Sequence, residues 1–169
     1  GAGLTETTTV IYTSDHGENL GARGLWGKSN MYEESAAIPL IIADPQSPLG
    51  ICATPVSLTD VSQTIVDVFQ AELASSNTAR SLLDIATPPD DLNRIVFSEY
   101  HAAGAVSGAF MLRQGRWKLI HYVGFAPELF DLEDDPEELR DRATDPDCAK
   151  ILAALWSELQ QICDPEDVD

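Results

Sequence analysis

Residues 13–42 have the sequence TSDHGENLGARGLWGKSNMYEESAAIPLII, in which a polar, glycine-rich loop separates two apolar runs. The first run, residues 8–14, is β-branched and aromatic and stops at Asp15, which predicts a buried strand. The second run, residues 38–43, predicts another strand and is closed by prolines and a glycine. The question is whether the loop cradles a phosphate, binds a metal or only connects the two strands.

A helix is predicted after the second strand. Thr59 is a natural N-cap, and Asp60 in the first turn is favoured by the helix dipole. Apolar residues then recur at helical spacing and form one face: Val61, Ile65, Val68 and Phe69. Strand, loop, strand and helix in this order indicate an α/β layer.

The second half of the chain predicts a small antiparallel sheet. The proline-bearing stretch 86–93 marks a boundary, which gives two domains at residues 1–88 and 89–169. Short strands are predicted within residues 94–101, 108–123 and 127–132. A turn at Gln114 and Gly115 folds the middle segment into a hairpin. A final helix carries an apolar stripe that we expect to pack against this sheet: Ile151, Leu152, Leu155, Trp156, Leu159 and Ile162.

The charge is strongly negative, with 10 Lys plus Arg against 28 Asp plus Glu and a formal net charge of −18. A polyanion would be repelled, so nucleic-acid binding is not expected. No apolar run reaches the length of a membrane helix, so no membrane association is expected either. Residues 128–147 are strongly acidic, and we expect a solvated loop with Asp-Pro turns rather than a calcium loop.

The three cysteines, Cys52, Cys148 and Cys163, are far apart in the sequence. Their number and spacing fit neither a disulfide framework nor a zinc ribbon, so reduced thiols are expected. The compartment is left open, and the lack of a disulfide pattern favours the cytoplasm.

Two kinds of site are considered in the glycine-rich loop. Its ending GLWGKS is like a phosphate-binding P-loop, but Ala22 stands where that motif needs glycine, and the strand ends well upstream. A metal is the alternative, with Asp15 and His16 at the carboxyl end of a strand. Gly17 would permit the turn that brings both side chains to one ion. For a bare Asp-His pair, a loop-capping carboxylate and an ordinary polar histidine are the commoner explanation.

The whole stretch 13–42 resembles the type I sulfatases of the alkaline phosphatase superfamily. In that family such a block holds a metal-binding Asp with a neighbouring Asn or His, a glycine-rich loop, a Lys before a Tyr-Glu pair, and a strand beginning with Pro. Here these features fall on Asp15, His16, Lys28, Tyr32, Glu33 and Pro39. The resemblance continues through residues 56–69 and the small sheet, and the ending at 162–169 is similar to the choline-sulfatase branch.

The resemblance implies the C-terminal part of an alkaline phosphatase-like α/β sandwich, followed by a small antiparallel-sheet subdomain with a C-terminal helix. It also implies a hydrolase of small-molecule sulfate esters. Asp15 and His16 would bind a divalent metal ion, Ca, Mg or Mn, and Lys28 would contact the sulfate and offset its charge.

Four other residues are considered near the implied pocket. His101 and His121 are further candidates for lining it, although a structural role is favoured for each. Trp26 and Trp117 are expected to be packing residues rather than substrate platforms.

The family's nucleophile is a formylglycine made from the Cys of a C-x-P-S-R motif, and this chain has no match. Cys52 begins CATPV and Cys163 begins CDPED, so neither fits. We therefore expect the C-terminal portion of a longer enzyme, with the true N-terminus upstream, and no activity of this chain alone. Strands without their neighbours should expose edges and apolar faces.

Two other functions stay open. One is hydrolysis of phosphonate or phosphate esters within the same superfamily, because tetrahedral anions make similar demands on a site. The other is a non-catalytic module that serves only in assembly. The family often forms dimers or tetramers, so a homo-oligomer is expected in either case.

Overall fold

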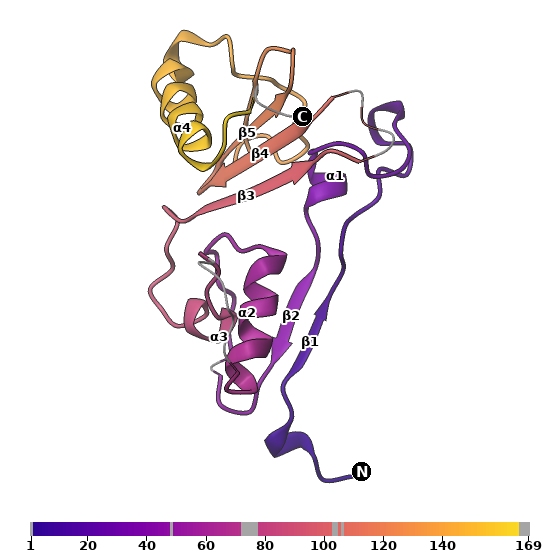
Figure 1. Ribbon diagram of the computed structural model, residues 1–169, viewed down its shortest axis with the longest axis vertical. Helices are drawn as coiled ribbons and strands as arrows, with labels where there is room; N and C mark the ends of the chain where they lie inside the picture. The colour runs from indigo at the N-terminus through magenta and orange to yellow at the C-terminus, as the bar shows by residue number, and fades with distance from the viewer. Residues whose placement is uncertain (1, 48, 72–77, 103–104, 106, 166–169) are drawn as a thin grey trace. The chain divides into compact units, whose positions relative to one another are not determined.

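The computed structural model describes residues 2–47, 49–71, 78–102, 105 and 107–165, and the chain divides into two compact units (Figure 1). The first unit contains Gly1–Asp15 and Pro39–Arg94, and the second contains His16–Ile38 and Ile95–Asp169. The glycine-rich loop thus belongs with the C-terminal unit, whereas the division into consecutive domains at residues 88 and 89 stays a prediction. Residues 166–169 of the chain's ending lie outside the described part.

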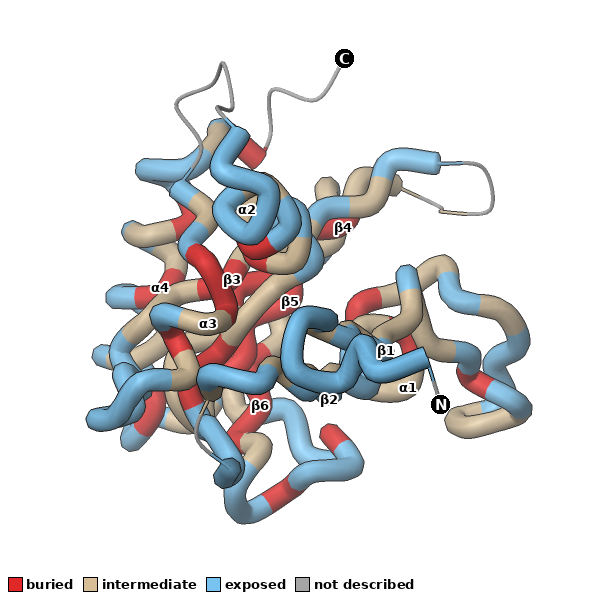
Figure 2. Tube along the Cα trace, turned by 90° about the horizontal axis from the view of Figure 1, so that it is seen from below, coloured by how far each residue is buried: buried red, intermediate tan, exposed pale blue. Residues whose placement is uncertain are grey.

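The first unit begins with a 3-10 turn, η1 (Thr5–Thr7), and an antiparallel pair of strands, β1 (Val10–Thr13) and β2 (Leu40–Ala43). Both predicted strands are confirmed, but the burial predicted for the first is wrong. Val10 and Tyr12 are 56% and 62% exposed. Figure 2 colours the chain by burial, with exposed residues in pale blue. A two-stranded ribbon leaves both faces open unless another layer covers them, and no described residue of this unit buries these two side chains.

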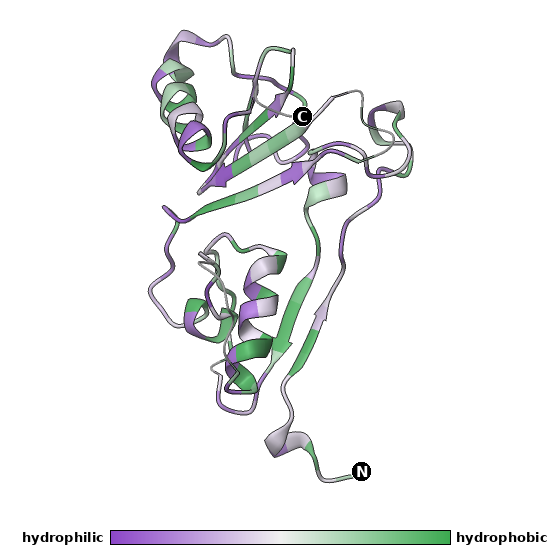
Figure 3. Ribbon diagram, in the orientation of Figure 1, coloured by the Kyte–Doolittle hydropathy of each residue, from purple (hydrophilic) through white to green (hydrophobic). Residues whose placement is uncertain are grey.

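Helix α2 (Leu58–Val68) begins earlier than predicted, because Ser57 rather than Thr59 is its N-cap and forms a capping box with the N3 carboxylate. The apolar face of this helix is open to solvent. Ile65 and Phe69 are 47% and 77% exposed, and the hydrophobic colouring of α2 and β2 is visible in Figure 3. The first unit therefore presents apolar side chains from a strand pair and from a helix.

The Asp60 carboxylate organises the interior of the first unit. It is 0% exposed, pairs with the Arg94 guanidinium at 2.7 Å and accepts the backbone N–H of Arg80 at 3.0 Å. One turn later, the Thr64 hydroxyl donates to the Asp60 carbonyl at 2.6 Å and accepts the first backbone N–H of α3 (Leu82–Ile85) at 2.8 Å. Polar groups of α2 thus tie this helix to α3 and to Arg94 within the unit.

The second unit is built on an antiparallel sheet in the order β3 (Ile95–Tyr100), β4 (Ala109–Gln114), β5 (Trp117–Tyr122) and β6 (Glu128–Asp131). All of its predicted strands are confirmed. The β4–β5 hairpin turns at Gly115 and Arg116 rather than at Gln114, because Gln114 pairs with Trp117. Gly115 has φ 55°, in the left-handed region that glycine enters at little cost.

Helix α4 (Ala149–Ile162) follows the 3-10 turn η3 (Pro146–Cys148) and covers one face of this sheet. Its Leu155 and Leu159 pack with sheet residues Leu112, Leu119 and Leu129. The packing predicted for the final helix is therefore confirmed. None of the helices in the described ranges combines the length and apolar character needed to cross a bilayer.

Residues 16–38 cover the opposite face of the sheet. This segment contains η2 (Ala22–Gly24) and the short helix α1 (Glu33–Ala36). Successive strand residues point to opposite sides, so the strand residues between those under α4 form a second cluster, into which Met31 of the loop segment packs: Ala109, Met111, Ile120 and Phe130. The small sheet is thus a platform for the loop that carries the candidate site.

The acidic stretch 128–147 is a solvated loop only in part, because its first residues are strand and some of its carboxylates are buried, while most residues from 133 to 147 are exposed as predicted. Its first residues form β6, and Asp135 and Glu138 are 8% and 3% exposed. The Asp135 carboxylate accepts the backbone N–H of Arg140 at 2.8 Å. These carboxylates have partners inside the protein, which composition alone does not reveal.

We expect Leu155→Ala to lower the free energy of unfolding by about 2–5 kcal/mol, because truncating a packed leucine leaves a cavity. Leu155 is 1% exposed, whereas Ile162 at the end of the same helix is 47% exposed. Ile162→Ala is the control and should cost less than about 1 kcal/mol. Urea unfolding followed by circular dichroism measures both values, and equal losses would contradict the packing of α4 on the sheet.

Candidate functional site

The candidate ligands Asp15 and His16 follow β1, which ends at Thr13. They lie outside the strand, so the alternation of strand side chains does not force them apart. Asp15 is exposed, and the Ser14 hydroxyl donates to its carboxylate at 3.4 Å. Asp15 is the last residue of this part of the first unit, and His16 is the first residue of the second.

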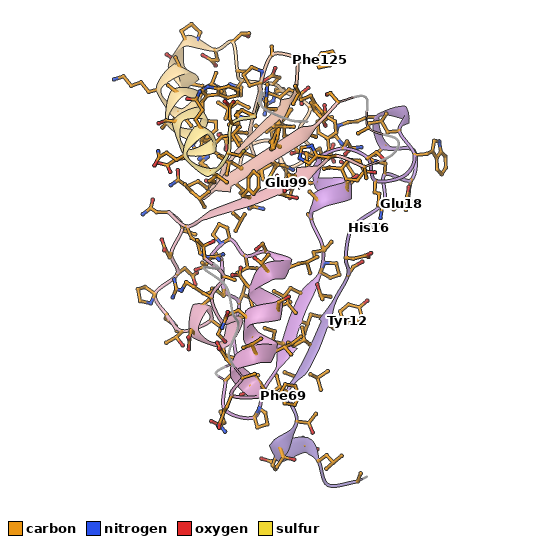
Figure 4. The ribbon with its side chains drawn as sticks, viewed as in Figure 1. Tyr12, His16, Glu18, Phe69, Glu99 and Phe125 are labelled. Carbon is orange, nitrogen blue, oxygen red and sulfur yellow. The ribbon has the colours of Figure 1, made fainter. Side chains whose placement is uncertain are left out.

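The imidazole of His16 is oriented by its own neighbour in the chain. Its Nδ1 lies 2.7 Å from the carbonyl oxygen of Gly17. A carbonyl can only accept, so Nδ1 is the donor in this hydrogen bond. His16 and Glu18 are labelled in Figure 4 on the segment that follows β1. Nε2 is therefore the ring nitrogen that would ligate a metal.

Gly17 is required by a close approach and not by a turn with positive φ. Its backbone N–H donates to the Ser35 carbonyl at 2.8 Å. A Cβ at this position would lie 2.0 Å from the carbonyl oxygen of Glu34. The backbone next to His16 thus rests directly against α1, and any side chain at position 17 would displace it.

The loop that follows is closed at its base by hydrogen bonds to Gly27. The backbone N–H of Asn19 donates to the Gly27 carbonyl at 3.0 Å, and the Glu18 carboxylate accepts the Gly27 N–H at 2.5 Å. Lys28 comes next and its side chain is exposed. Trp26 is 76% exposed, so its predicted packing role is wrong, whereas Trp117 packs against the sheet cluster as predicted.

Tyrosine and glutamate side chains fasten the loop segment to the sheet. The Tyr32 hydroxyl donates to the Glu128 carboxylate at 3.1 Å, and the Tyr122 hydroxyl accepts the Met31 N–H at 3.3 Å. Burial raises the pKa of the Glu128 carboxyl and, together with the Glu128 charge, the pKa of the Tyr32 hydroxyl. The tyrosine therefore stays a donor at neutral pH.

A buried ion cluster reinforces this attachment. The Lys118 ammonium, on β5, lies 2.7 Å from a Glu33 carboxylate oxygen and 2.8 Å from one of Glu138. Arg23 pairs with Glu34 and donates to the Glu137 carbonyl. Sequence reasoning missed this cluster, although a lysine within an otherwise apolar strand is the signal that could have found it.

A cavity of about 430 Å³ lies in the second unit beside the loop. Trp26, Tyr122, Phe125 and Glu128 are among its lining residues. The candidates His101 and His121 are not among the described residues that line it.

The two candidate histidines of the sheet have structural neighbours. The His121 ring is 3% exposed and meets Trp156 edge-on at 4.8 Å. The His101 ring meets Phe110 at 5.1 Å, and its Nε2 lies 3.6 Å from the Glu99 carboxylate. These contacts favour the structural role, and a part in lining a substrate pocket stays a prediction.

The donor set decides how much of a metal site this chain can offer. Asp15 and His16 supply one oxygen and one nitrogen donor type, which suit a divalent ion such as Mn²⁺. Among the residues that the structure describes, no group of at least 3 His, Cys, Asp or Glu side chains could hold a metal ion. Asp15 and His16 alone would therefore leave most coordination positions of a divalent ion to other ligands.

Comparison with known proteins shows what the chain is similar to. The family model described as N-sulphoglucosamine sulphohydrolase, C-terminal, matches residues 21–164. A choline-sulfatase of Rhizobium meliloti (strain 1021) is 34% identical over 145 residues, which make up 85% of this chain and 28% of that protein.

Two solved structures are similar over nearly the whole chain. BT4656, solved in complex with its substrate D-glucosamine-2-N,6-O-disulfate, has a TM-score of 0.81 and 26% identity, over 97% of this chain and 37% of that one. Phosphonate monoester hydrolase SpPMH from Silicibacter pomeroyi has a TM-score of 0.77 and 29% identity, over 92% of this chain and 34% of that one. The chain therefore spans 28% to 37% of the length of these proteins.

The raised pKa of Glu128 gives a pH-dependent prediction. A carboxyl whose pKa is higher in the folded state holds its proton more tightly there, so its charge opposes folding above that pKa. This cost disappears as the pH falls below the ordinary value of 4.5. We expect Glu128→Gln, whose amide oxygen still accepts from Tyr32, to raise the free energy of unfolding at neutral pH.

The gain should shrink to nothing as the pH is lowered, and chemical denaturation from acidic to neutral pH measures it. Glu6→Gln, at an exposed residue of η1 in the first unit, is the control and should show no gain at any pH. A gain that grows as the pH falls would contradict the assigned direction.

Proposed function

Because the chain belongs to the N-sulphoglucosamine sulphohydrolase C-terminal family, we propose that it supplies metal-binding and sulfate-binding residues to a sulfatase. Its α/β elements and antiparallel sheet with a C-terminal helix confirm the predicted alkaline phosphatase-like fold class. The proposed reaction is hydrolysis of a small-molecule sulfate ester.

The observation that carries the proposal is the presentation of His16. Its Nδ1 bonds to the Gly17 carbonyl at 2.7 Å, which makes Nε2 the nitrogen that faces a metal in this proposal, and the exposed Asp15 carboxylate precedes it in the chain. The same loop ends at Gly27, directly before Lys28.

Each of these residues has a role in the proposed reaction. A divalent ion, when bound, polarises the sulfate oxygens and offsets negative charge. Asp15 and His16 hold that ion, which we propose to be Ca, Mg or Mn. Carboxylate oxygen suits all three metals, and imidazole is better suited to a transition metal such as Mn. Lys28 places an ammonium group against the sulfate, where charge builds during transfer.

The nucleophile is proposed to lie outside this chain. Neither Cys52 nor Cys163 stands in the C-x-P-S-R context from which a formylglycine is made. The chain spans 28% of the choline-sulfatase that it resembles, so we propose that a longer protein carries the formylglycine and the other metal ligands. The chain alone is then inactive.

Other properties follow the same proposal. BT4656 was solved with a sulfated sugar that is its substrate, which supports a sulfate ester as the partner here. The net charge of −18 disfavours nucleic acid, and we propose no membrane partner and a homo-oligomer. The three free cysteines favour a reducing compartment such as the cytoplasm.

A phosphonate or phosphate ester hydrolase is the second candidate, because SpPMH is 29% identical and similar in structure over 92% of this chain. A non-catalytic assembly module is the third, and it is favoured by the small number of metal donors among the described residues. The substrate panel and the metal titration below separate the three.

The variants are made in the longer protein that is proposed to carry the nucleophile. There we expect Lys28→Ala to fold normally and to lower kcat for a sulfate ester by about 10²-fold, because the ammonium group no longer stabilises charge in the transition state. Lys150→Ala is the control, since Lys150 is an exposed lysine of α4. A panel of matched sulfate, phosphate and phosphonate esters is measured with both variants. Preferential turnover of phosphate or phosphonate esters would rule out the sulfatase assignment.

Metal binding by this chain is expected to be weak, because most coordination positions are left to water. Calorimetric titration with Mn²⁺ should give a Kd well above the roughly micromolar values of complete oxygen-ligand sites. Asp15→Asn and His16→Asn should each weaken binding further, while Asp67→Asn, at an exposed residue of α2, should not. Binding that is unchanged in both ligand variants would contradict the metal site.

A further inference from the structure

Lys118 is the only lysine among the largest fully buried side chains of the described residues, and its exposure is 0%. A buried ammonium must find charged partners, since its loss of hydration is otherwise uncompensated. It finds two, at 2.7 Å from Glu33 and 2.8 Å from Glu138. Glu33 is the first residue of α1, so the ammonium fixes where this helix begins.

The Glu138 carboxylate binds the backbone at the same end of α1. Its second carboxylate oxygen accepts the Glu33 N–H at 2.7 Å, while the first faces Lys118. Glu138 has φ 50°, an uncommon left-handed conformation for a residue with a side chain. Arg23 lies 3.7 Å from this carboxylate on the loop side. The Glu138 carboxylate thus binds the first residue of α1 with one oxygen, while Lys118 faces the other oxygen.

The other end of α1 carries the backbone next to His16. The Ser35 carbonyl accepts the Gly17 N–H at 2.8 Å, and the Ser35 hydroxyl accepts from the Asn19 amide at 3.0 Å. Gly17 in turn supplies the carbonyl that fixes the His16 ring. Every step from Lys118 to His16 is therefore a contact within the second unit.

We propose that Lys118 is a positioning residue for His16, acting through Glu33, Glu138 and the helix α1. The proposal rests on the proposed metal-binding role of His16. Lys118 does not touch the metal or the substrate. It sets the height of α1 above the sheet, and α1 sets the backbone of Gly17 and with it the ring of His16.

The energetics favour a positioning role over simple stabilisation. A buried ion pair contributes little net stability compared with a well-packed apolar side chain of similar volume. A methionine at position 118 would fill the same space, since Ile120 and Met111 already pack on this face. What Lys118 supplies is a buried positive charge that draws one carboxylate oxygen each from Glu33 and Glu138 to the same strand.

The test compares histidine tautomers in metal-free full chain, by ¹⁵N NMR at about pH 8.5, where ordinary imidazoles are neutral. We expect wild-type His16 to be the Nδ1–H tautomer and Lys118→Met to lose that preference. The Gly17 amide should exchange with solvent about tenfold faster in the variant. Mn²⁺ should bind about tenfold more weakly, as for other residues that orient metal ligands. His101 is the internal reference, and Lys150→Met is the matched control.

Because Lys118→Met leaves buried carboxylates without their counter-charge, a second variant guards against misfolding. Lys118→Met with Glu138→Gln removes both charges and keeps an amide oxygen for the Glu33 N–H. Wild-type His16 tautomer and Gly17 exchange in this folded double variant would overturn the proposal. If wild-type His16 instead shows no response to Mn²⁺, the metal site fails, and the metal-free comparison still decides the role of Lys118.

Discussion

The buried ammonium of Lys118 is the constraint on which the second unit depends. With 0% exposure it cannot be hydrated, so Glu33 and Glu138 must both come to β5. Glu33 precedes the strands of the sheet in the sequence, and Glu138 follows them. Their meeting brings the loop segment, residues 16–38, onto one face, while α4 closes the other. A short sheet with two covered faces can keep its strands almost wholly buried.

The first unit is also organised by a buried charged side chain, here a carboxylate. Asp60, also 0% exposed, gathers Arg94 and the backbone of Arg80. Its apolar surface is left open at Tyr12 and Phe69, which are 62% and 77% exposed (Figure 4). Open apolar faces on a strand pair and a helix indicate a missing layer. We propose that other parts of a longer protein form that layer, since the chain spans 28% of the choline-sulfatase length.

Local patterns predict the second unit well, because each strand and α4 bury a face within it. They fail where a partner is distant or polar. Ser57 rather than Thr59 is the N-cap and shares a capping box with Asp60. In the acidic stretch, Glu138 pairs with Lys118, and Asp135 accepts the backbone N–H of Arg140. The site residues Asp15, His16 and Lys28 stay predictions, which come from the resemblance of a whole block. The sequence offers no signal for the Gly17 contact with Glu34, which exists only once α1 is in place.

The placement of His16 by backbone contact also explains why α1 can be so short. A helix of 4 residues has little stability of its own, so its position must come from its two ends. Glu138 and Lys118 hold the first end, and Gly17 and Asn19 meet Ser35 at the second. Because α1 is fixed at both ends, a shift of its first end moves Gly17 and His16 at the other, whereas a flexible loop would not transmit the shift. The geometry of the candidate site is therefore a property of the small sheet as much as of the glycine-rich loop.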